Sequence, residues 1–332
     1  TLNGLMEFSS FGYNKLFNTN VNEKIFVNDL SYKSQTSIKD TGLVNNFQFL
    51  LRNFNADSKN STSLKNKSES NLKGIFQFES KFPLQKNGEK YLSTLTPIFV
   101  AKYNPQNNKN INNEERLIDY SNIYSIDRLS SSTVLEGGES ITIGNEFKLF
   151  NNLDKSSEIF GLNLAASFRA DENLDLPKSS FISQKTSNIV GQSKLKLNEF
   201  IDLQYDFLSD NNLGNFHYHN MNTKFKINNF VSTFEFIEEN DEIGSTHFIA
   251  NETSLKIDDN KNLKFRTRKN KKTDLTEYYN LIYEYKMDCL TAAFEYNKDY
   301  YTDGSLKPEE RLFFSITIMP FDNSINLPGI DK

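Results

Sequence analysis

Alternation of apolar and polar residues recurs along almost the whole chain and limits the fold more than any other feature. In residues 74–82, for example, Phe76, Phe78 and Phe82 fall on one side of an extended backbone, and the polar residues between them fall on the other. A period of two residues is that of a half-buried β-strand. No stretch of comparable length has the period of about 3.6 residues that marks a helix. The sequence therefore predicts an all-β protein.

Clusters of Asn, Asp, Gly and Lys divide the alternating segments into about sixteen strands. Many of them have about ten residues or more, longer than the five or six usual in globular sheets. Consecutive strands of this kind predict an antiparallel up-and-down meander. The predicted spans are 5–13, 24–36, 42–54, 72–83, 90–103, 139–150, 158–170, 187–197, 200–208, 215–227, 230–238, 246–257, 262–269, 275–286, 289–298 and 310–320.

The lengths of the connections favour a transmembrane barrel. Counting back from the C-terminus, short connections alternate with mostly longer ones, and the longer ones are 299–309, 239–245, 171–186, 104–138 and 55–71. Bacterial outer-membrane barrels have short periplasmic turns and long extracellular loops. If the C-terminus is periplasmic, this parity fits at nearly every step. A soluble sandwich is the alternative, because its outer faces also accept charge.

Composition excludes several other classes of protein. No run approaches the roughly 18 apolar residues that a transmembrane helix needs. The 38 basic and 43 acidic residues are well mixed, so no basic face follows a phosphate backbone and nucleic acid is not expected as a partner. The single cysteine cannot form an internal disulfide framework. The start TLNGLMEF, which has neither an initiator Met nor a signal peptide, suggests a piece of a longer protein.

Two passages resemble the LptD (OstA) family of lipopolysaccharide-assembly outer-membrane proteins, particularly its alphaproteobacterial branch. Residues 95–147 contain NIYSIDR, similar to the family's N-(L/I)-(F/Y)-S-x-(N/D)-R segment, and EGGESITIG, similar to its E-G-G-x-R-x-x-x-G start of the next strand. Residues 280–321 resemble the family's C-terminal ending, and residues 188–212 fit a strand pair between the two passages. The chain departs from the family in SSSTVLEGG, which replaces an S-G-x-D-R step, and in Asp288 before Cys289, where an acidic pair is usual.

The resemblance implies that residues 1–321 are the later part of an outer-membrane barrel of about 26 strands, and that 322–332 form a short periplasmic tail. It also implies assembly of lipopolysaccharide at the cell surface, with the glycan crossing through the lumen and the lipid leaving through a lateral gate. No enzymatic activity and no cofactor are expected. The implied partners are lipopolysaccharide, periplasmic Lpt bridge proteins, the barrel-insertion machinery and, where it exists, an LptE-like plug lipoprotein. A fragment with two open sheet edges is expected to be unstable or mis-closed by itself.

The same resemblance assigns roles to particular residues. The terminal strand would form the gate through Leu312, Phe314, Ile316, Ile318, Pro320 and Phe321. The charged side of the strands would line the lumen through Asp202, Asp206, Lys264, Arg266 and Arg268. For Cys289 it implies a disulfide to a cysteine in the family's periplasmic domain. A lone thiol without a partner is the alternative, and both interpretations stay open.

Three further motifs have plainer interpretations. His217 and His219 would share one side of a strand, as a metal site requires, but no third ligand is evident, and lumen-facing polar residues are favoured over a metal. Gly137 and Gly138 lack the Lys-Ser/Thr of a phosphate loop and are predicted to be turn glycines. The basic segment 269–274 could touch lipid A phosphates, although a solvated hairpin tip is the ordinary interpretation.

Two rival functions follow from the same reasoning. A generic outer-membrane porin or receptor barrel has the same architecture and is the alternative function. An outer-membrane enzyme would need a Ser/His or Asp/His constellation, and none stands out in the sequence.

Overall fold

The computed structural model describes residues 3–16, 20–61, 64, 66–152, 157–240, 243–300 and 308–318. Its regular elements, in chain order, are β1 (Gly4–Leu16), β2 (Asn22–Ser34), β3 (Ser37–Ile38), β4 (Val44–Lys59), β5 (Glu69–Lys81), β6 (Leu84–Asn87), β7 (Tyr91–Asn104), β8 (Gly138–Asn151), β9 (Glu158–Arg169), the 3-10 turn η1 (Lys178–Ser180), β10 (Ile189–Lys196), β11 (Ile201–Ser209), β12 (Phe216–Ile227), β13 (Phe230–Glu239), β14 (His247–Lys256), β15 (Lys261–Asn270), β16 (Leu275–Lys286), β17 (Leu290–Asp299) and β18 (Glu309–Ile318). Within these residues no helix is long and apolar enough to cross a bilayer.

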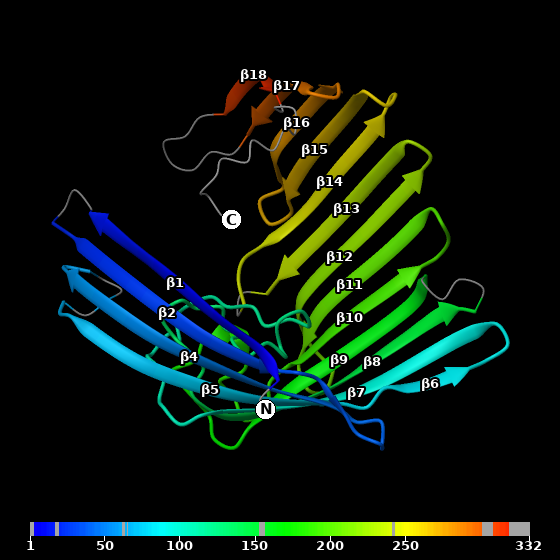
Figure 1. Cartoon of the computed structure of the whole chain (residues 1–332). Helices are drawn as coiled ribbons and strands as arrows, with labels where there is room; N and C mark the ends of the chain where they lie inside the picture. Colours follow the sequence, from blue (N-terminus) through cyan, green and yellow to red (C-terminus); the bar gives the residue numbers. More distant parts are fainter. Residues whose placement is uncertain are drawn as a thin grey trace, which may run out of the picture. The chain divides into compact units, whose positions relative to one another are not determined.

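The predicted all-β, antiparallel up-and-down architecture is confirmed. Every predicted span coincides with one long strand to within a few residues, and the strands follow one another in chain order (Figure 1). Strands β3 and β6 were not predicted, because their two and four residues are too short to show an alternation. Successive ladders such as β7–β8 and β16–β17 are antiparallel.

The chain divides into two compact units. The first contains Thr1–Leu195, Tyr205–His219 and Glu239–Ser245, and the second contains Lys196–Gln204, Asn220–Glu238 and Thr246–Lys332. Strands β1 to β10 belong almost entirely to the first unit, and β13 to β18 to the second.

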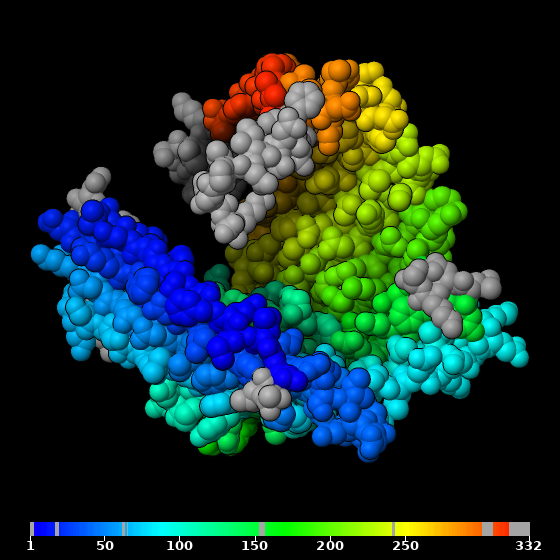
Figure 2. Space-filling model, viewed as in Figure 1, coloured from blue at the N-terminus to red at the C-terminus, as the bar shows by residue number. Residues whose placement is uncertain are grey.

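The sheet of the first unit has one aromatic face and one polar face. Exposed residues of the aromatic face include Phe47, Phe76, Phe99, Ile141 and Phe168. Cross-strand partners stack on this face, as in the pair Phe49–Phe76, whose ring centroids lie 4.7 Å apart. An exposed row of large apolar side chains is what a strand presents to lipid. Every described residue of β1 except Tyr13 is also exposed, and this strand (dark blue) lies at the surface in Figure 2.

The buried side chains of the first unit lie on its polar face. The alternate residues of β4, β5, β7, β8 and β9 that point to this face include Arg52, Gln77, Lys102, Thr142 and Ser167, all of them buried. Side chains on this face can be buried only if another segment of the chain covers them. That cover comes from two long connections, residues 105–137 and 170–188, which we call the covering loops.

The covering loops carry apolar anchors of their own. Ile118, Ile123 and Val134 are at most 1% exposed, and Leu176 and Ile182 of the second loop are equally buried. Leu135 packs with Leu50 of β4 and Ile75 of β5. These anchors bury apolar area against the sheet, and they make the loops part of the folded unit.

The second unit repeats the division into two faces. One row across five strands reads Leu255, Leu263, Tyr283, Phe294 and Phe314. A row on the opposite face reads Glu252, Arg266, Asn280, Asn297 and Arg311. The register of the ladders thus sorts apolar and charged residues onto separate sides.

Candidate functional site: a buried ion cluster beneath the covering loops

An arginine of the first covering loop lies at the centre of a buried ion cluster. Arg128 is 1% exposed and binds Glu136 in bidentate fashion, with Nε to Oε2 at 2.6 Å and Nη2 to Oε1 at 2.5 Å. Its Nη1 donates to Ser167 Oγ of β9 at 2.9 Å, and Nη2 donates to Ser140 Oγ of β8 at 3.2 Å. Arg128 therefore ties its own loop to two strands through a geometry that a lysine could not reproduce.

A second arginine shares the same carboxylate. Arg169, the last residue of β9, donates from Nη1 to Glu136 and from Nη2 to the carbonyl oxygen of Gly137. Two guanidinium groups therefore flank one buried carboxylate. Gly138, the next residue, has φ 84° and begins β8, so Gly137 and Gly138 lie at the turn into a strand, as predicted from the sequence.

A third arginine holds the loop from the other side. Arg52 of β4 binds Asp29 of β2 through two hydrogen bonds, at 2.8 and 2.7 Å. The same guanidinium donates to Asp127 Oδ2 of the loop at 3.1 Å and to the carbonyl oxygen of Ser131. The adjacent residues Asp127 and Arg128 are thus bound to different groups of strands.

Hydrogen bonds to backbone carbonyl oxygens extend this attachment along the loop. Gln77 of β5 donates to the carbonyl oxygen of Tyr124 at 3.1 Å, and Lys102 of β7 donates to that of Ser125. Asn104, at the end of β7, donates to the carbonyl oxygen of Glu136 at 2.9 Å. Residues 124–136 are therefore fastened to strands from β2 to β9 by side chains of the polar face.

Burial and charge oppose each other at the two loop carboxylates. Burial alone would raise the pKa of Glu136, but Arg128 above all, together with Lys102 and Arg169, lowers that pKa to about 2. At Asp127 burial is the larger influence, and the pKa is raised above its ordinary value although Arg52 opposes the change. Glu136 therefore stays ionised throughout the neutral range.

The stabilisation from Glu136 is expected to disappear in acid. Its folded-state pKa lies below the ordinary value of 4.5, so its contribution is complete above that value and is lost as the pH falls toward 2. We expect the stability difference between the native protein and a Glu136→Gln variant to narrow over this interval, as measured by the midpoint of heat-induced unfolding on gels. A difference that stays constant down to pH 2 would contradict this linkage.

One glycine lies where the loop and a strand approach each other closely. A Cβ at Gly144 of β8 would lie 1.7 Å from Tyr124 Oη and 2.7 Å from the carbonyl oxygen of Leu164. Tyr124 packs edge-to-face on Tyr120 at 5.6 Å, and Tyr120 Oη donates to Glu146 Oε1 at 3.0 Å. Burial raises the pKa of both tyrosines well above the ordinary value, so both stay neutral. Tyr124 of the motif segment NIYSIDR therefore occupies the space that a side chain at position 144 of β8 would fill.

The residues predicted to line a lumen are not part of this cluster. Lys264 and Arg266 share one face of β15 and pair with Glu284 and Glu252, each at 3.0 Å, and Arg268 on the same face pairs with Glu277. Asp206 belongs to the first unit, where it accepts a hydrogen bond from Gln192 at 2.8 Å. Asp202 is exposed on β11 in the second unit. Their role as lumen lining stays a prediction.

The remaining predicted residues lie apart from one another. Leu312, Phe314, Ile316 and Ile318 are exposed on one face of β18, and Pro320, Phe321 and the predicted tail 322–332 lie outside the described residues. Cys289 is half-buried in the turn between β16 and β17 and is a free thiol in this chain. Its disulfide stays a prediction, and so do the gate and the division at residue 321.

The histidines pack against aromatic rings. His219 Nδ1 lies 2.6 Å from Tyr205 Oη, and the His217 ring lies 5.0 Å from that of Phe181. In the described part of the chain no group of three His, Cys, Asp or Glu residues could hold a metal ion. At the hairpin tip, Lys269 pairs with Asp274 at 2.7 Å.

Sequence reasoning missed the ion cluster itself. No local pattern in the sequence marks the members of the cluster, which are Arg52, Asp127, Arg128, Glu136 and Arg169. The one available signal was the order of the motifs NIYSIDR and EGG, which contain Asp127, Arg128 and Glu136. These motifs indicate a family, but nothing in them indicates that the two segments meet.

Comparisons with known proteins give one family and several distant structural likenesses. The family model described as "LptD: LPS transport system D" matches residues 31–243. No curated protein matches the chain.

The chain resembles solved structures of two siderophore receptors and a porin at low sequence identity. A ferric enterobactin receptor (PfeA) mutant from Pseudomonas aeruginosa is 9% identical with a TM-score of 0.45, over 96% of this chain and 60% of that one. The siderophore receptor PirA from Acinetobacter baumannii is 11% identical with a TM-score of 0.41, over 90% and 56%. A Rh. blastica porin mutant is 9% identical with a TM-score of 0.36, over 95% and 99%. The chain spans about three fifths of the length of the siderophore receptors that it matches.

Proposed function

This chain belongs to the LptD family, LPS transport system D, which resides in the bacterial outer membrane, and on that premise we propose that it forms part of the barrel that assembles lipopolysaccharide at the cell surface. The observation that carries the proposal is the family match over residues 31–243. The reaction is a translocation in which no bond is made or broken. The partners of the whole protein would be lipopolysaccharide and the periplasmic Lpt bridge proteins, with an LptE-like plug where one exists.

The two faces of the strands suit an amphiphilic substrate. The polar face offers hydrogen-bonding groups to a glycan, while the aromatic face suits acyl chains and membrane lipid. In this proposal the glycan passes along the polar face, and the lipid leaves beside the terminal strand. The gate would involve Leu312, Phe314, Ile316 and Ile318, whose exposed side chains would then contact lipid.

The covering loops support transport over free diffusion. They lie over the polar face of the first unit, and three arginines fasten the loop 105–137 to its strands. A porin needs an open aqueous path along that face, whereas a translocon that admits one class of molecule benefits from a face that is closed at rest. A generic porin or receptor barrel is the second candidate, because it shares the same strand architecture.

Depletion of the full-length protein in its own host is the test. We expect lipopolysaccharide at the cell surface to fall and newly made lipopolysaccharide to accumulate inside the cell, as measured by surface labelling and by fractionation. If surface lipopolysaccharide stayed constant, and the purified protein conducted ions as an open pore, the porin function would replace the one proposed.

A further inference from the structure

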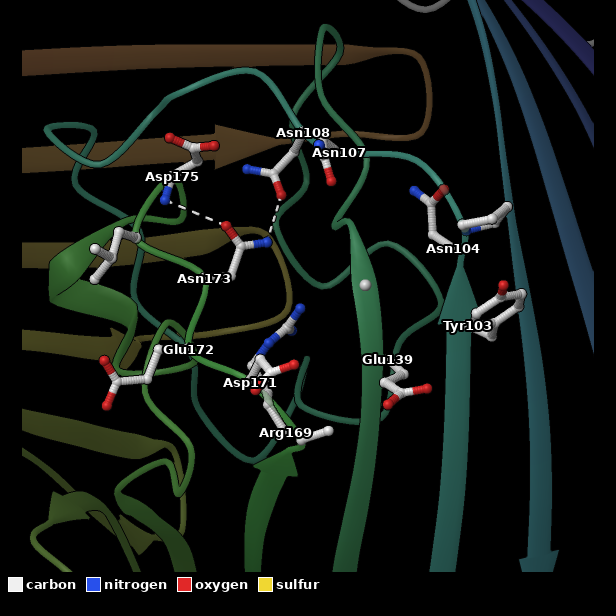
Figure 3. A pocket seen from close by; sticks show the side chains of 14 residues that line it. Tyr103, Asn104, Asn107, Asn108, Glu139, Arg169, Asp171, Glu172, Asn173 and Asp175 are labelled. Atoms are coloured by element: carbon white, nitrogen blue, oxygen red, sulfur yellow. Dashed lines mark hydrogen bonds between the residues drawn. The ribbon is translucent and has the colours of Figure 1, made fainter.

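A cavity opens where the long connections leave the first unit. It has a volume of about 520 Å³ and lies at the ends of β7, β8 and β9, beside the beginnings of both covering loops (Figure 3). This volume is within the range of about 300–1,000 Å³ usual for small-molecule sites. By the parity of the connections, this end of the strands faces the outside of the cell.

The floor of the cavity is built from amide side chains. Asn108 Oδ1 accepts hydrogen bonds from Asn173 Nδ2 at 2.7 Å and from the backbone N–H of Gly137 at 3.3 Å. Asn173 Oδ1 in turn accepts from the backbone N–H of Asp175 at 3.2 Å. Figure 3 shows Asn108, Asn173 and Asp175 joined in this way. The two covering loops therefore hold each other in place at the cavity.

Four carboxylates on the walls have no partner within the described residues. They belong to Glu139, Asp171, Glu172 and Asp175. Arg169 also lines the cavity, but its Nη groups are engaged by Glu136 and Gly137, so it does not neutralise them. The Nε–H group of Arg169 is buried and has no hydrogen-bond partner in the described residues, and the whole residue is only 8% exposed. The cavity therefore offers a ligand carboxylate acceptors that no other group of the described residues uses.

The chemistry of these groups selects among ligand classes. A metal ion needs several carboxylates close together, and in the described residues no three acidic, His or Cys side chains are placed to hold one. Phosphate offers acceptors only and would be repelled by four negative charges. A sugar hydroxyl both donates and accepts, so it can serve carboxylates, the Asn107 amide and Tyr103 at once.

From this geometry we propose that the cavity is a binding subsite for the phosphate-free, hydroxyl-rich sugars of the transported glycan, at the cell-surface end of its path. This inference rests on the proposed function, because only a chain that transports a glycolipid would present a glycan here. The subsite would discriminate between parts of one substrate by holding uncharged sugars and rejecting phosphorylated ones.

Binding to the full-length protein in detergent tests the proposal. The probes are two fractions released from the host's lipopolysaccharide by mild acid, one phosphate-free and one phosphorylated, with affinities measured by titration calorimetry. We expect the phosphate-free fraction to bind more tightly. A double variant that carries Asp171→Ala and Glu172→Ala should bind the phosphate-free fraction about tenfold more weakly or worse, because charge-assisted hydrogen bonds are lost.

A matched control and a second variant make the result decisive. Glu115→Gln removes an exposed carboxylate of the other covering loop, 105–137, that does not line the cavity, and it should leave the affinity unchanged. A variant that carries both Asp171→Asn and Glu172→Gln should show a smaller difference in affinity between the phosphate-free and the phosphorylated fraction. Unchanged binding in the alanine variant, or tighter binding of the phosphorylated fraction, would overturn the subsite. In either case a depletion experiment that still shows lost surface lipopolysaccharide would leave the proposed function standing.

Discussion

Glu136→Gln is expected to destabilise the full-length protein by about 3–5 kcal/mol, which is the range for removing one partner of a buried ion pair. The substitution leaves Arg128 and Arg169, both buried, without the carboxylate that they share. The covering loop 105–137 should then detach from the polar face. We expect a lower midpoint of heat-induced unfolding, faster proteolysis within residues 105–137, and cells that admit bulky antibiotics normally excluded.

An exposed ion pair in the same loop provides the control. Glu114 and Arg116 pair at 3.0 Å, with side chains 43% and 33% exposed. Glu114→Gln should cost no more than about 1 kcal/mol, because water already solvates both groups. Equal effects of the two substitutions would show that the buried cluster does not hold the loop.

Gly144→Ala is the second substitution expected to have a large effect. The added methyl group would overlap Tyr124 Oη and would also press on the carbonyl oxygen of Leu164. Either the tyrosine or the strand has to move, and overpacking of this kind typically costs about 1–3 kcal/mol. The measurement is again the unfolding midpoint of the full-length protein, because Gly144 lies on a strand and not within the loop.

A double substitution identifies the cause of this effect. Tyr124→Phe removes the hydroxyl that a Cβ at position 144 would meet first, so Gly144→Ala should cost less in that background. The recovery should be partial, since the contact with Leu164 remains. Gly74→Ala is the matched control, because its nearest neighbour, a ring carbon of Phe49, lies 3.3 Å away. Strictly additive effects at positions 144 and 124 would contradict the proposed contact.

The long strands were predictable because their signal is local. Alternation within about ten residues decides which side of a strand is apolar, and it placed Lys264, Arg266 and Arg268 on one face and Phe265 on the other before any partner strand was known. The structure agrees, with Lys264 beside Glu284 and Arg266 beside Glu252. Turn residues marked most strand ends for the same local reason.

The ion cluster was not predictable because its signal is not local. Arg128 and Glu136 are eight residues apart, and Glu136 and Arg169 are 33 apart. A charged loop without periodicity has the same sequence pattern as a solvated connection. The sequence therefore predicts residues 104–138 only as a long connection. Nothing in the local pattern indicates that Arg128 would be 1% exposed.

The sequence by itself determined the class of fold, the strands, the two faces of each strand and, through its motifs, the family. The tertiary structure alone decided that the covering loops fold back onto the polar face, that three arginines hold the loop 105–137 there, and that a carboxylate-lined cavity opens beside them. The physical reason is that a strand's faces follow from the geometry of a single extended backbone. The burial of a charge, by contrast, depends on partners that distant segments supply only after the chain has folded.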